Sequence, residues 1–384
     1  MRTAAKPLPS QLDIRVLDSL SGVPAADWDR LAGRQPFLRH AFLHALHETG
    51  CASGKTGWMP QYLSAWRDKE LVAALPLYLK THSYGEYVFD WAWADAYERC
   101  GLAYYPKLLS AIPFSPVTGP RLIGTDPEAR AELRRAALQL AEQVSSFHVL
   151  FPDTAEARAW HDAGCLMRRG VQFHWRNEGY ENFDAFLGTL SRAKRKNIRQ
   201  ERRRVANAGI TFERKTGDRI SGEDWRFYTR CYNHTYRAHH STPYLNLAFF
   251  ERLSDTLPEN VLMVIAQRDG RPIAAALDLY TDEALYGRYW GALESIPGLH
   301  FETCYYQALE FCIERGIALF EGGAQGEHKL ARGFLPVETW SAHWLRHPQF
   351  NDAVERFLAR EMMGMESYID ELNERSPYKH GRVS

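Results

Sequence analysis

The sequence predicts an α/β protein, of the α+β type, that is built from two packed copies of one unit. Its 384 residues exceed the length that a single hydrophobic core usually organises, which favours two units. Hydrophobic residues make up 45% of the chain and charged residues 24%, a composition typical of folded globular proteins. One order of predicted elements, namely a hairpin, a third strand, a loop, a helix and a strand, occurs twice along the chain.

The first copy begins with two strand-like runs that flank the turn Arg67-Asp68-Lys69. Further on, Thr125-Asp126-Pro127 is a typical helix start, with proline in the first turn. From there apolar residues recur at three- and four-residue steps, as on one face of a helix. The predicted elements are strands at 61–66, 70–80 and 87–93, a helix from Asp126 to Ser145, a strand at 147–151, a short helix that ends at Gly164 and a strand at 165–175.

The second copy contains the strongest short hairpin signal of the chain, Asp269-Gly270 between two apolar runs. The first copy is longer because of an irregular, Tyr- and Pro-rich insertion at 95–119. Coincidence is the alternative to duplication, because such elements are common. The predicted elements of the second copy are strands at 261–267, 272–280 and 284–291, a helix that stops at Gly316 and a strand at 317–321.

Two segments lie outside the duplicated order. Residues 183–207 carry apolar positions among basic residues and predict an amphipathic helix between the copies. An apolar stripe from Phe350 to Tyr368 predicts a closing helix on the core. We therefore expect an N-terminal domain at 1–170, a C-terminal domain at 171–347 that includes the basic helix, and a closing helix and tail at 348–384.

The charge of the whole chain is balanced, with 47 Lys and Arg against 47 Asp and Glu, which excludes a protein whose entire surface binds nucleic acid. Within residues 192–204, however, eight cations stand against the single acid Glu201. Such a cluster repels itself unless an anion offsets it, and the phosphates of RNA or of a CoA-type nucleotide would do so. Arg195 and Arg199 are candidates for these phosphate contacts. The alternative is a solvated helix face.

A glycine-rich segment, residues 320–334, follows the last strand of the second copy, where open α/β sheets place their ligands. Gly322, Gly323 and Gly326 permit a ligand to approach the backbone closely, and the backbone N–H groups would stabilise an oxyanion. The alternative is a glycine-rich turn with solvated charges. The titratable side chains that follow are Glu327, His328, Lys329 and Arg332.

The strand, loop and helix start that lead to Glu302 would form an anion site, because the first N–H groups of a helix are unpaired and its dipole is positive there. Arg288 and Trp290 would line the same mouth, because alternate side chains of a strand share a face. Arg288, Lys329 and Arg332 would anchor phosphate or carboxylate. Glu302 is a candidate base, or an acid that the helix dipole stabilises.

The segment around residue 100 is rich in aromatic and acidic residues, which often form binding surfaces on long loops. The alternative is an aromatic plug that covers the edge of the sheet. The candidates for substrate binding are Asp90, Trp93, Tyr97, Tyr104, Tyr105 and Lys107.

Missing patterns exclude several classes of function. The chain contains no GxSxG, P-loop or GxGxxG motif. It has no HExxH motif, and its six cysteines form no CxxC pair, so no metal site is expected. No run of eighteen apolar residues occurs, and the first ten residues contain no apolar signal segment. We therefore expect a cytoplasmic protein without a transmembrane segment.

The chain contains, in this order, LSRAKRKNIRQERRR, PYLNLAFFERL, GRYWG, FETCYYQ, EGGAQGEHKLARGF and SPYK. With these stretches it resembles a bacterial family of predicted N-acyltransferases, related to the Fem-type (FemAB-like) peptidyltransferases and to the GNAT superfamily. The resemblance implies tandem GNAT-like domains, each a mixed twisted sheet flanked by helices, and acyl transfer to an amine. The GNAT pyrophosphate signature ends in Gly or Ala, whereas the nearest run here, from Arg288 to Leu293, ends in Leu. Acetyl-CoA binding is therefore not implied residue by residue.

The leading expectation is an N-acyltransferase in which an amine attacks an activated carbonyl held between the two domains. His328 is the first candidate for the base because its ordinary pKa lies closest to neutrality, and Glu327 and Glu302 are further candidates. No cofactor is expected to bind tightly. The co-substrate would be acyl-CoA or, as in Fem-type relatives, aminoacyl-tRNA, and a small molecule or peptide would supply the amine. The alternative is a non-catalytic protein that binds RNA or a cell-wall precursor with the same fold.

Overall fold

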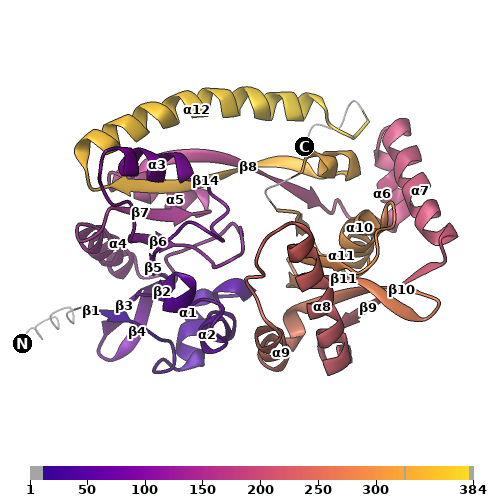
Figure 1. The fold of residues 1–384 in the computed structure, drawn as a ribbon, viewed down its shortest axis with the longest axis horizontal. Helices are drawn as coiled ribbons and strands as arrows, with labels where there is room; N and C mark the ends of the chain where they lie inside the picture. Colours follow the sequence, from indigo (N-terminus) through magenta and orange to yellow (C-terminus); the bar gives the residue numbers. More distant parts are fainter. Residues whose placement is uncertain (1–11, 324–325, 380–384) are drawn as a thin grey trace, which may run out of the picture.

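The computed structural model describes residues 12–323 and 326–379 and consists of two α/β halves (Figure 1). The first half lies at the left of Figure 1 in indigo and purple, and much of the second half lies at the right in orange. The long helix α12, in yellow, extends across both. The predicted α/β class is confirmed. The second half contains the expected hairpin, third strand, helix and strand in that order, and the first half contains the expected hairpin, helix and strand.

Most strands belong to one mixed sheet of eleven strands, in the order β2-β5-β6-β7-β14-β8-β13-β12-β11-β10-β9. A separate sheet of three strands has the order β1-β3-β4. The strands are β1 (Asp13–Leu17), β2 (Trp58–Pro60), β3 (Tyr62–Arg67), β4 (Glu70–Leu75), β5 (Tyr78–Lys80), β6 (Lys107–Ser110), β7 (Ser146–Leu150), β8 (Leu166–Arg176), β9 (Ile210–Thr216), β10 (Val261–Arg268), β11 (Arg271–Tyr280), β12 (Ala284–Ala292), β13 (Leu319–Glu321) and β14 (Leu335–Leu345).

Local signals position the helices. The predicted start of α4 is confirmed, because the Asp126 side chain accepts a hydrogen bond from the backbone N–H of Ala129 and Pro127 occupies the first turn. Within the described ranges, no helix combines the length and the apolar character needed to cross a membrane. The helices are α1 (Ala25–Ala32), α2 (His40–Glu48), α3 (Trp91–Arg99), α4 (Pro127–Ala141), α5 (Thr154–Asp162), α6 (Phe183–Thr189), α7 (Arg192–Asn207), α8 (Gly222–Ala238), α9 (Leu247–Thr256), α10 (Leu299–Phe301), the π-helical η5 (Glu302–Tyr306), α11 (Gln307–Arg315), the 3-10 helix η6 (Glu327–Arg332) and α12 (Pro348–Glu374).

The two halves exchange strands at the centre of the large sheet. β8, which follows the first half in sequence, pairs antiparallel with β13 of the second half. β14, which follows the second half, pairs antiparallel with β7 of the first half, and β8 and β14 pair with each other. The boundary predicted between residues 170 and 171 falls inside β8, and the three predicted domain ranges stay a prediction.

One hydrophobic core joins the two halves. The ring of Phe42 in α2 packs on that of Phe249 in α9 with centroids 5.6 Å apart, and the ring of Phe37 packs on that of Tyr286 in β12 at 5.3 Å. Phe37, Phe42 and Phe249 are all fully buried. Burying a side chain of this size stabilises a fold by about 1.5–3 kcal/mol, so apolar burial holds the halves together.

Two predicted elements are wrong in detail. In the run at 87–93, predicted as a strand, residues 87–90 form a loop and residues 91–93 begin α3. Trp93 and Tyr97 lie four residues apart and are both buried. This helical spacing outweighs the alternating pattern of the preceding residues, which is typical of a strand. The single helix predicted at 183–207 is two helices, because Leu190 is extended and forms a bridge with the C-terminal segment.

Candidate functional site

The strands β12 and β13 part in the second half. They pair in parallel only from Ala284 with Leu319 to Tyr286 with Glu321. β13 ends there, whereas β12 continues to Ala292 without a strand partner on that side. We call this place the β12–β13 fork; it comprises the end of β12 and the segment that follows β13. Open α/β sheets bind their ligands at the carboxyl ends of strands, which makes the fork the first candidate site.

Arg288 lies at the centre of the fork, and its side chain is only 2% exposed. Its guanidinium binds the Glu321 carboxylate at 3.2 Å, donates to the Gly287 carbonyl at 2.8 Å and lies over the ring of Phe37. Burial raises the pKa of Glu321, and Arg288 opposes the rise. A buried ion pair thus joins the two strands of the fork.

Asp278 of β11 and Lys329 are further buried charges beside Arg288. Burial raises the pKa of Asp278 to about 8 despite the opposing effect of Arg288, so this carboxyl holds its proton at neutral pH. Burial and Arg288 lower the pKa of the Lys329 ammonium to about 8. Groups that titrate this close to neutrality are typical of sites that move protons. Sequence reasoning missed Asp278, for which the available signal was a single acid within the apolar run 273–280.

The backbone around the fork is irregular. The helix that packs on β10 and β11 contains the π-helical segment η5 between α10 and α11, and the chain enters it at Gly298 with a left-handed φ of 89°. Beneath it, the register between β11 and β12 shifts after Leu277. Trp290, at the end of β12, contacts the ring of His300 in α10 at 5.2 Å. Both π-helical segments and strand irregularities are over-represented at functional sites.

His328 follows β13 and is more exposed than its neighbours in the fork. Its Nε2 lies 3.2 Å from the hydroxyl of Tyr305 in η5. Partial burial, and then the charges of Lys329 and Arg332, lower the pKa of His328. The imidazole is therefore neutral at pH 7 and able to accept a proton, which agrees with the predicted role without testing it.

Glu327 and Glu302, the other two predicted bases, are engaged in ion pairs. Glu327 binds Arg375 at 2.9 Å, beyond the end of α12. Glu302 is buried and binds Arg202 of α7 at 2.9 Å. Both carboxylates are occupied by these contacts, which weighs against either residue as the base. Their catalytic roles stay predictions.

The glycines after β13 occupy positions that the backbone reserves for glycine. A Cβ at Gly322 would lie 2.9 Å from the Phe173 carbonyl oxygen, and Gly323 and Gly326 have φ values of 82° and 100°. The N–H of Gly322 already donates to the Phe173 carbonyl at 2.9 Å, which weighs against Gly322 as an oxyanion donor. The roles of Gly323 and Gly326 stay predictions, and residues 324–325 lie outside the described residues.

The predicted cationic cluster forms the outer face of α7, while the inner face is tied to the fork. Buried Arg332 binds Glu201 of α7 at 2.8 Å, so it holds this helix in place. Arg199 pairs with Asp184 at 2.8 Å in an exposed contact, which contributes little to stability. Phosphate binding by Arg195 and Arg199 stays a prediction. A hollow of about 620 Å³ on the outer face is lined by Arg192, Arg195, Lys196, Arg199, Gln200 and Arg203.

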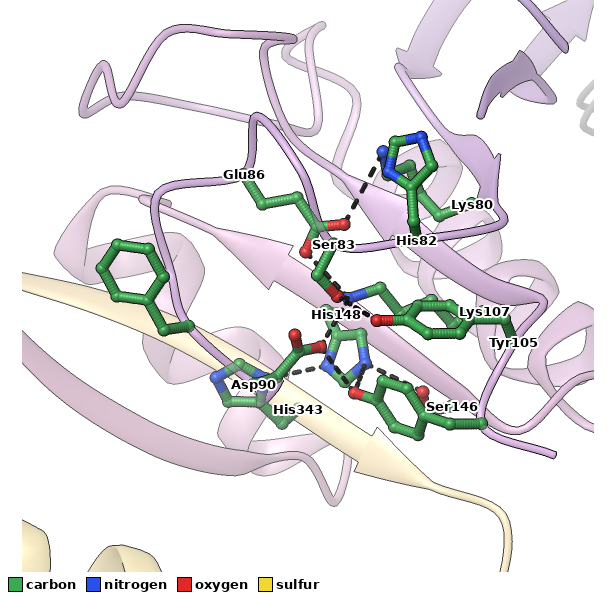
Figure 2. A network of polar contacts seen from close by, with 12 residues as sticks. Lys80, His82, Ser83, Glu86, Asp90, Tyr105, Lys107, Ser146, His148 and His343 are labelled. Atoms are coloured by element: carbon green, nitrogen blue, oxygen red, sulfur yellow. Dashed lines mark hydrogen bonds and ion pairs between the residues drawn. The ribbon is translucent and has the colours of Figure 1, made fainter. Parts of the chain in front are cut away.

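The residues predicted to bind substrate in the first half are mostly buried. Figure 2 shows Lys107 beside Glu86 and Asp90, all three within a closed polar network. Tyr104, also buried, donates from its hydroxyl to Asp90 at 2.6 Å. Lys107 holds the pKa of Asp90 well below its usual range although burial acts in the opposite direction. The structure therefore favours the aromatic plug over an open binding surface. The remaining candidates are Trp93 and Tyr97, both buried, and Tyr105, which is half-buried.

The same network connects the exchanged strands. His148 of β7 and His343 of β14 place their Nδ1 atoms 2.8 Å apart, and both rings lie in Figure 2 below Lys107. Burial lowers the pKa of both imidazoles, so both are neutral, and one donates while the other accepts. Sequence reasoning missed this pair because β14 was not predicted. The contact fixes the register of the exchange rather than serving a ligand.

The chain belongs to the FemAB-like family, described as peptidoglycan biosynthesis/recognition, which it matches over residues 19–380. The family resemblance of the sequence is thereby confirmed. No curated protein matches the chain significantly.

Solved structures share the fold at low sequence identity. The C-terminal domain of a protein described as a lysylphosphatidylglycerol synthetase from Agrobacterium fabrum has a TM-score of 0.53 at 12% identity, over 86% of this chain and 94% of that one. A conserved protein of unknown function from Bacteroides thetaiotaomicron has a TM-score of 0.52 at 14% identity, over 86% and 99%. FemX is more distant, with a TM-score of 0.49 at 14% identity over 77% and 90%. The first two of these structures share the α/β fold over most of this chain.

Proposed function

We propose that the protein is an N-acyltransferase that moves an acyl or aminoacyl group from an activated donor to an amine at the β12–β13 fork. The observation that supports this most is the group of buried titratable side chains around Arg288. The pKa values of Asp278 and Lys329 lie near neutrality, and His328, the residue directly before Lys329, is neutral. Membership of the FemAB-like family adds support from outside the site.

In the proposed reaction the amine nitrogen attacks the carbonyl carbon of a thioester or ester and forms the new C–N bond. His328 takes the proton that the amine loses. The developing oxyanion is stabilised by the charge of Arg288. As the C–S or C–O bond breaks, Asp278, which holds its proton up to about pH 8, returns a proton to the departing sulfur or oxygen.

The donor is proposed to be acyl-CoA or aminoacyl-tRNA, because both carry phosphates and the outer face of α7 is cationic. Arg195 and Arg199 would bind these phosphates beside the fork. The acceptor is proposed to be a small-molecule or peptide amine, which accords with the family description. Both donors occur in the cytoplasm, where we propose that the protein acts.

A second candidate is a non-catalytic protein that uses the cationic face of α7 to bind RNA or a cell-wall precursor. The outer row of arginine and lysine side chains favours it, because phosphate contacts alone give binding without chemistry. A salt titration of RNA binding, repeated with Arg195→Gln and Arg199→Gln, measures this face. A steep loss of RNA affinity with rising salt, together with no acyl transfer, would favour the non-catalytic binding protein.

The experiment that separates the two is donor consumption. Purified protein is incubated with acyl-CoA and, separately, with aminoacyl-tRNA, each with a set of amino acids and short peptides as acceptors. We expect one donor to be consumed with formation of an amide, which mass spectrometry detects. If neither donor is consumed in the presence of any acceptor, the acyl-transfer proposal fails.

A further inference from the structure

A cavity of about 520 Å³ lies at the end of β8, outside the residues discussed so far as donor or catalytic groups. Three segments that are distant in sequence line it: residues 174–180, residues 333–337 and residues 373–378. The last segment is held over the cavity by Tyr378, whose hydroxyl donates to the Gly333 carbonyl at 2.7 Å. The volume of this cavity falls in the range of small-ligand sites.

His174 lies at the inner end of this cavity and is 7% exposed. The amide nitrogen of Gln172 donates to the Pro116 carbonyl at 2.7 Å, so the Gln172 oxygen is the atom that accepts from His174 Nε2 at 3.1 Å. Burial, followed by the charge of Arg288, lowers the pKa of His174 to about 3, so the ring is neutral and its Nδ1 has a lone pair. That Nδ1 bonds to no other described residue and is available to a ligand.

Two charges of opposite sign lie further out along the same wall. Arg176 and Glu178 follow His174 at two-residue steps, as on one face of an extended chain, and both are exposed. Neither forms an ion pair within the described part of the chain. The cavity therefore presents a cation, an anion and a neutral hydrogen-bond acceptor to one ligand.

The cavity adjoins the β12–β13 fork. His174 pairs with Glu321 across β8 and β13 and with Leu335 across β8 and β14. The charges of Arg288 and Lys329 both act on the His174 imidazole, which shows that the fork lies within electrostatic reach of the inner end. A ligand that fills the cavity would extend toward the groups proposed for acyl transfer.

We propose that this cavity binds the acceptor as a free amino acid or short peptide, with its carboxylate at Arg176 and its amine between Glu178 and His174. Arginine matches a carboxylate with two parallel hydrogen bonds. Glu178 attracts the amine in its protonated form. After this proton passes to solvent, His174 Nδ1 accepts an N–H and leaves the nitrogen lone pair free to attack, and His328 takes the proton lost during the attack. The role as acceptor rests on the proposed function, whereas the binding does not.

Isothermal titration calorimetry with alanyl-alanine, its C-terminal amide and its N-acetyl derivative tests the site without any acyl donor. Wild-type protein is expected to bind alanyl-alanine roughly tenfold more tightly than either derivative, because each derivative lacks one charge. Arg176→Gln is expected to bind the dipeptide only as tightly as wild type binds the amide. Glu178→Gln is expected to bind it only as tightly as wild type binds the N-acetyl derivative.

Arg271→Gln is the matched control, because Arg271 is exposed at the β10–β11 hairpin, and it is expected to behave as wild type. No binding, equal binding of the three compounds, or unchanged dipeptide binding by Arg176→Gln overturns the proposal. Dipeptide binding that depends on Arg176 without any acyl transfer keeps the cavity and rejects the proposed function. Acyl transfer that Arg176→Gln leaves unchanged keeps the function and rejects the cavity as the acceptor site.

Discussion

The two halves contain equivalent parallel strand pairs, and different groups surround each pair. In the first half β6 and β7 pair in parallel, as β12 and β13 do in the second. There the chain itself occupies the space: Arg121 is 1% exposed and donates to the backbone carbonyls of Leu150 and Phe151. Glu156 accepts from the backbone N–H groups of Arg121 and Leu122. In this half, backbone groups thus bind both the Arg121 and the Glu156 side chains.

In the second half, a buried arginine and glutamate occur again, but Arg288 binds the Glu321 side chain and lies beside Asp278 and Lys329. Titratable side chains can exchange protons near neutral pH, whereas a backbone carbonyl cannot. Under the proposed function, the first-half pair is a scaffold and the second-half pair is the site of the chemistry.

Replacing Arg288 or Arg121 is expected to have the largest effect on the free energy of unfolding, and it tests this comparison. Arg288→Met leaves Glu321 buried without its cation, and we expect the free energy of unfolding to fall by roughly 3–5 kcal/mol. Arg121→Met leaves buried carbonyls without a donor and is expected to cost a similar amount, since each unsatisfied group costs about 1–3 kcal/mol. Urea denaturation measures both. A decrease in the free energy of unfolding below about 1 kcal/mol for either variant would contradict the buried contacts of that arginine.

His328→Ala tests the role of the β12–β13 fork. Removing a general base lowers turnover by about 10²–10⁴-fold, and we expect a loss in that range with the donor that wild type consumes. His161→Ala is the matched control, because His161 is exposed on α5 far along the chain from the fork. Unaltered turnover by His328→Ala would remove this residue from the mechanism and return attention to Glu327 and Glu302.

The expected effect of Asp278→Asn depends on pH. The pKa of Asp278 is about 8 in the folded protein against its usual 3.8, so the folded state keeps a proton that the unfolded state loses above about pH 4. The free energy of unfolding therefore falls as pH rises toward 8, by about 1.4 kcal/mol per pH unit at most. Asp278→Asn removes this dependence, so the wild-type and variant curves diverge between pH 5 and 8. Parallel curves would contradict the raised pKa.

Much of the fold could be predicted from local sequence signals. The hairpin at Asp269-Gly270 forms because both residues adopt positive φ, and α4 begins at its Asp126 cap. The exchange of β8 and β14 could not be predicted, because strand pairing between distant segments leaves no local pattern. The run at 87–93 alternates like a strand, yet burial of Trp93 against the neighbouring strands and α12 favours a helix.

The candidate site could be predicted only in part. Arg288 and Lys329 were expected at the fork because basic residues follow its strand and its glycines, and both lie there. Asp278 was missed because an acid inside an apolar strand has no motif, and its pKa is raised only by burial in the folded chain. The cationic run could not be divided by sequence into Arg202, which binds Glu302, and the outer face, which has Asp184 as one exposed partner.

The most direct test of the account compares donor consumption by wild type, Arg121→Met and Arg288→Met at equal concentrations of folded protein. We predict that Arg121→Met keeps most of the wild-type turnover, because Arg121 belongs to the scaffold, and that Arg288→Met loses at least about a hundredfold through the missing oxyanion stabilisation. Equal losses of turnover in the two variants, or full turnover by Arg288→Met, would contradict the assignment of the chemistry to the β12–β13 fork.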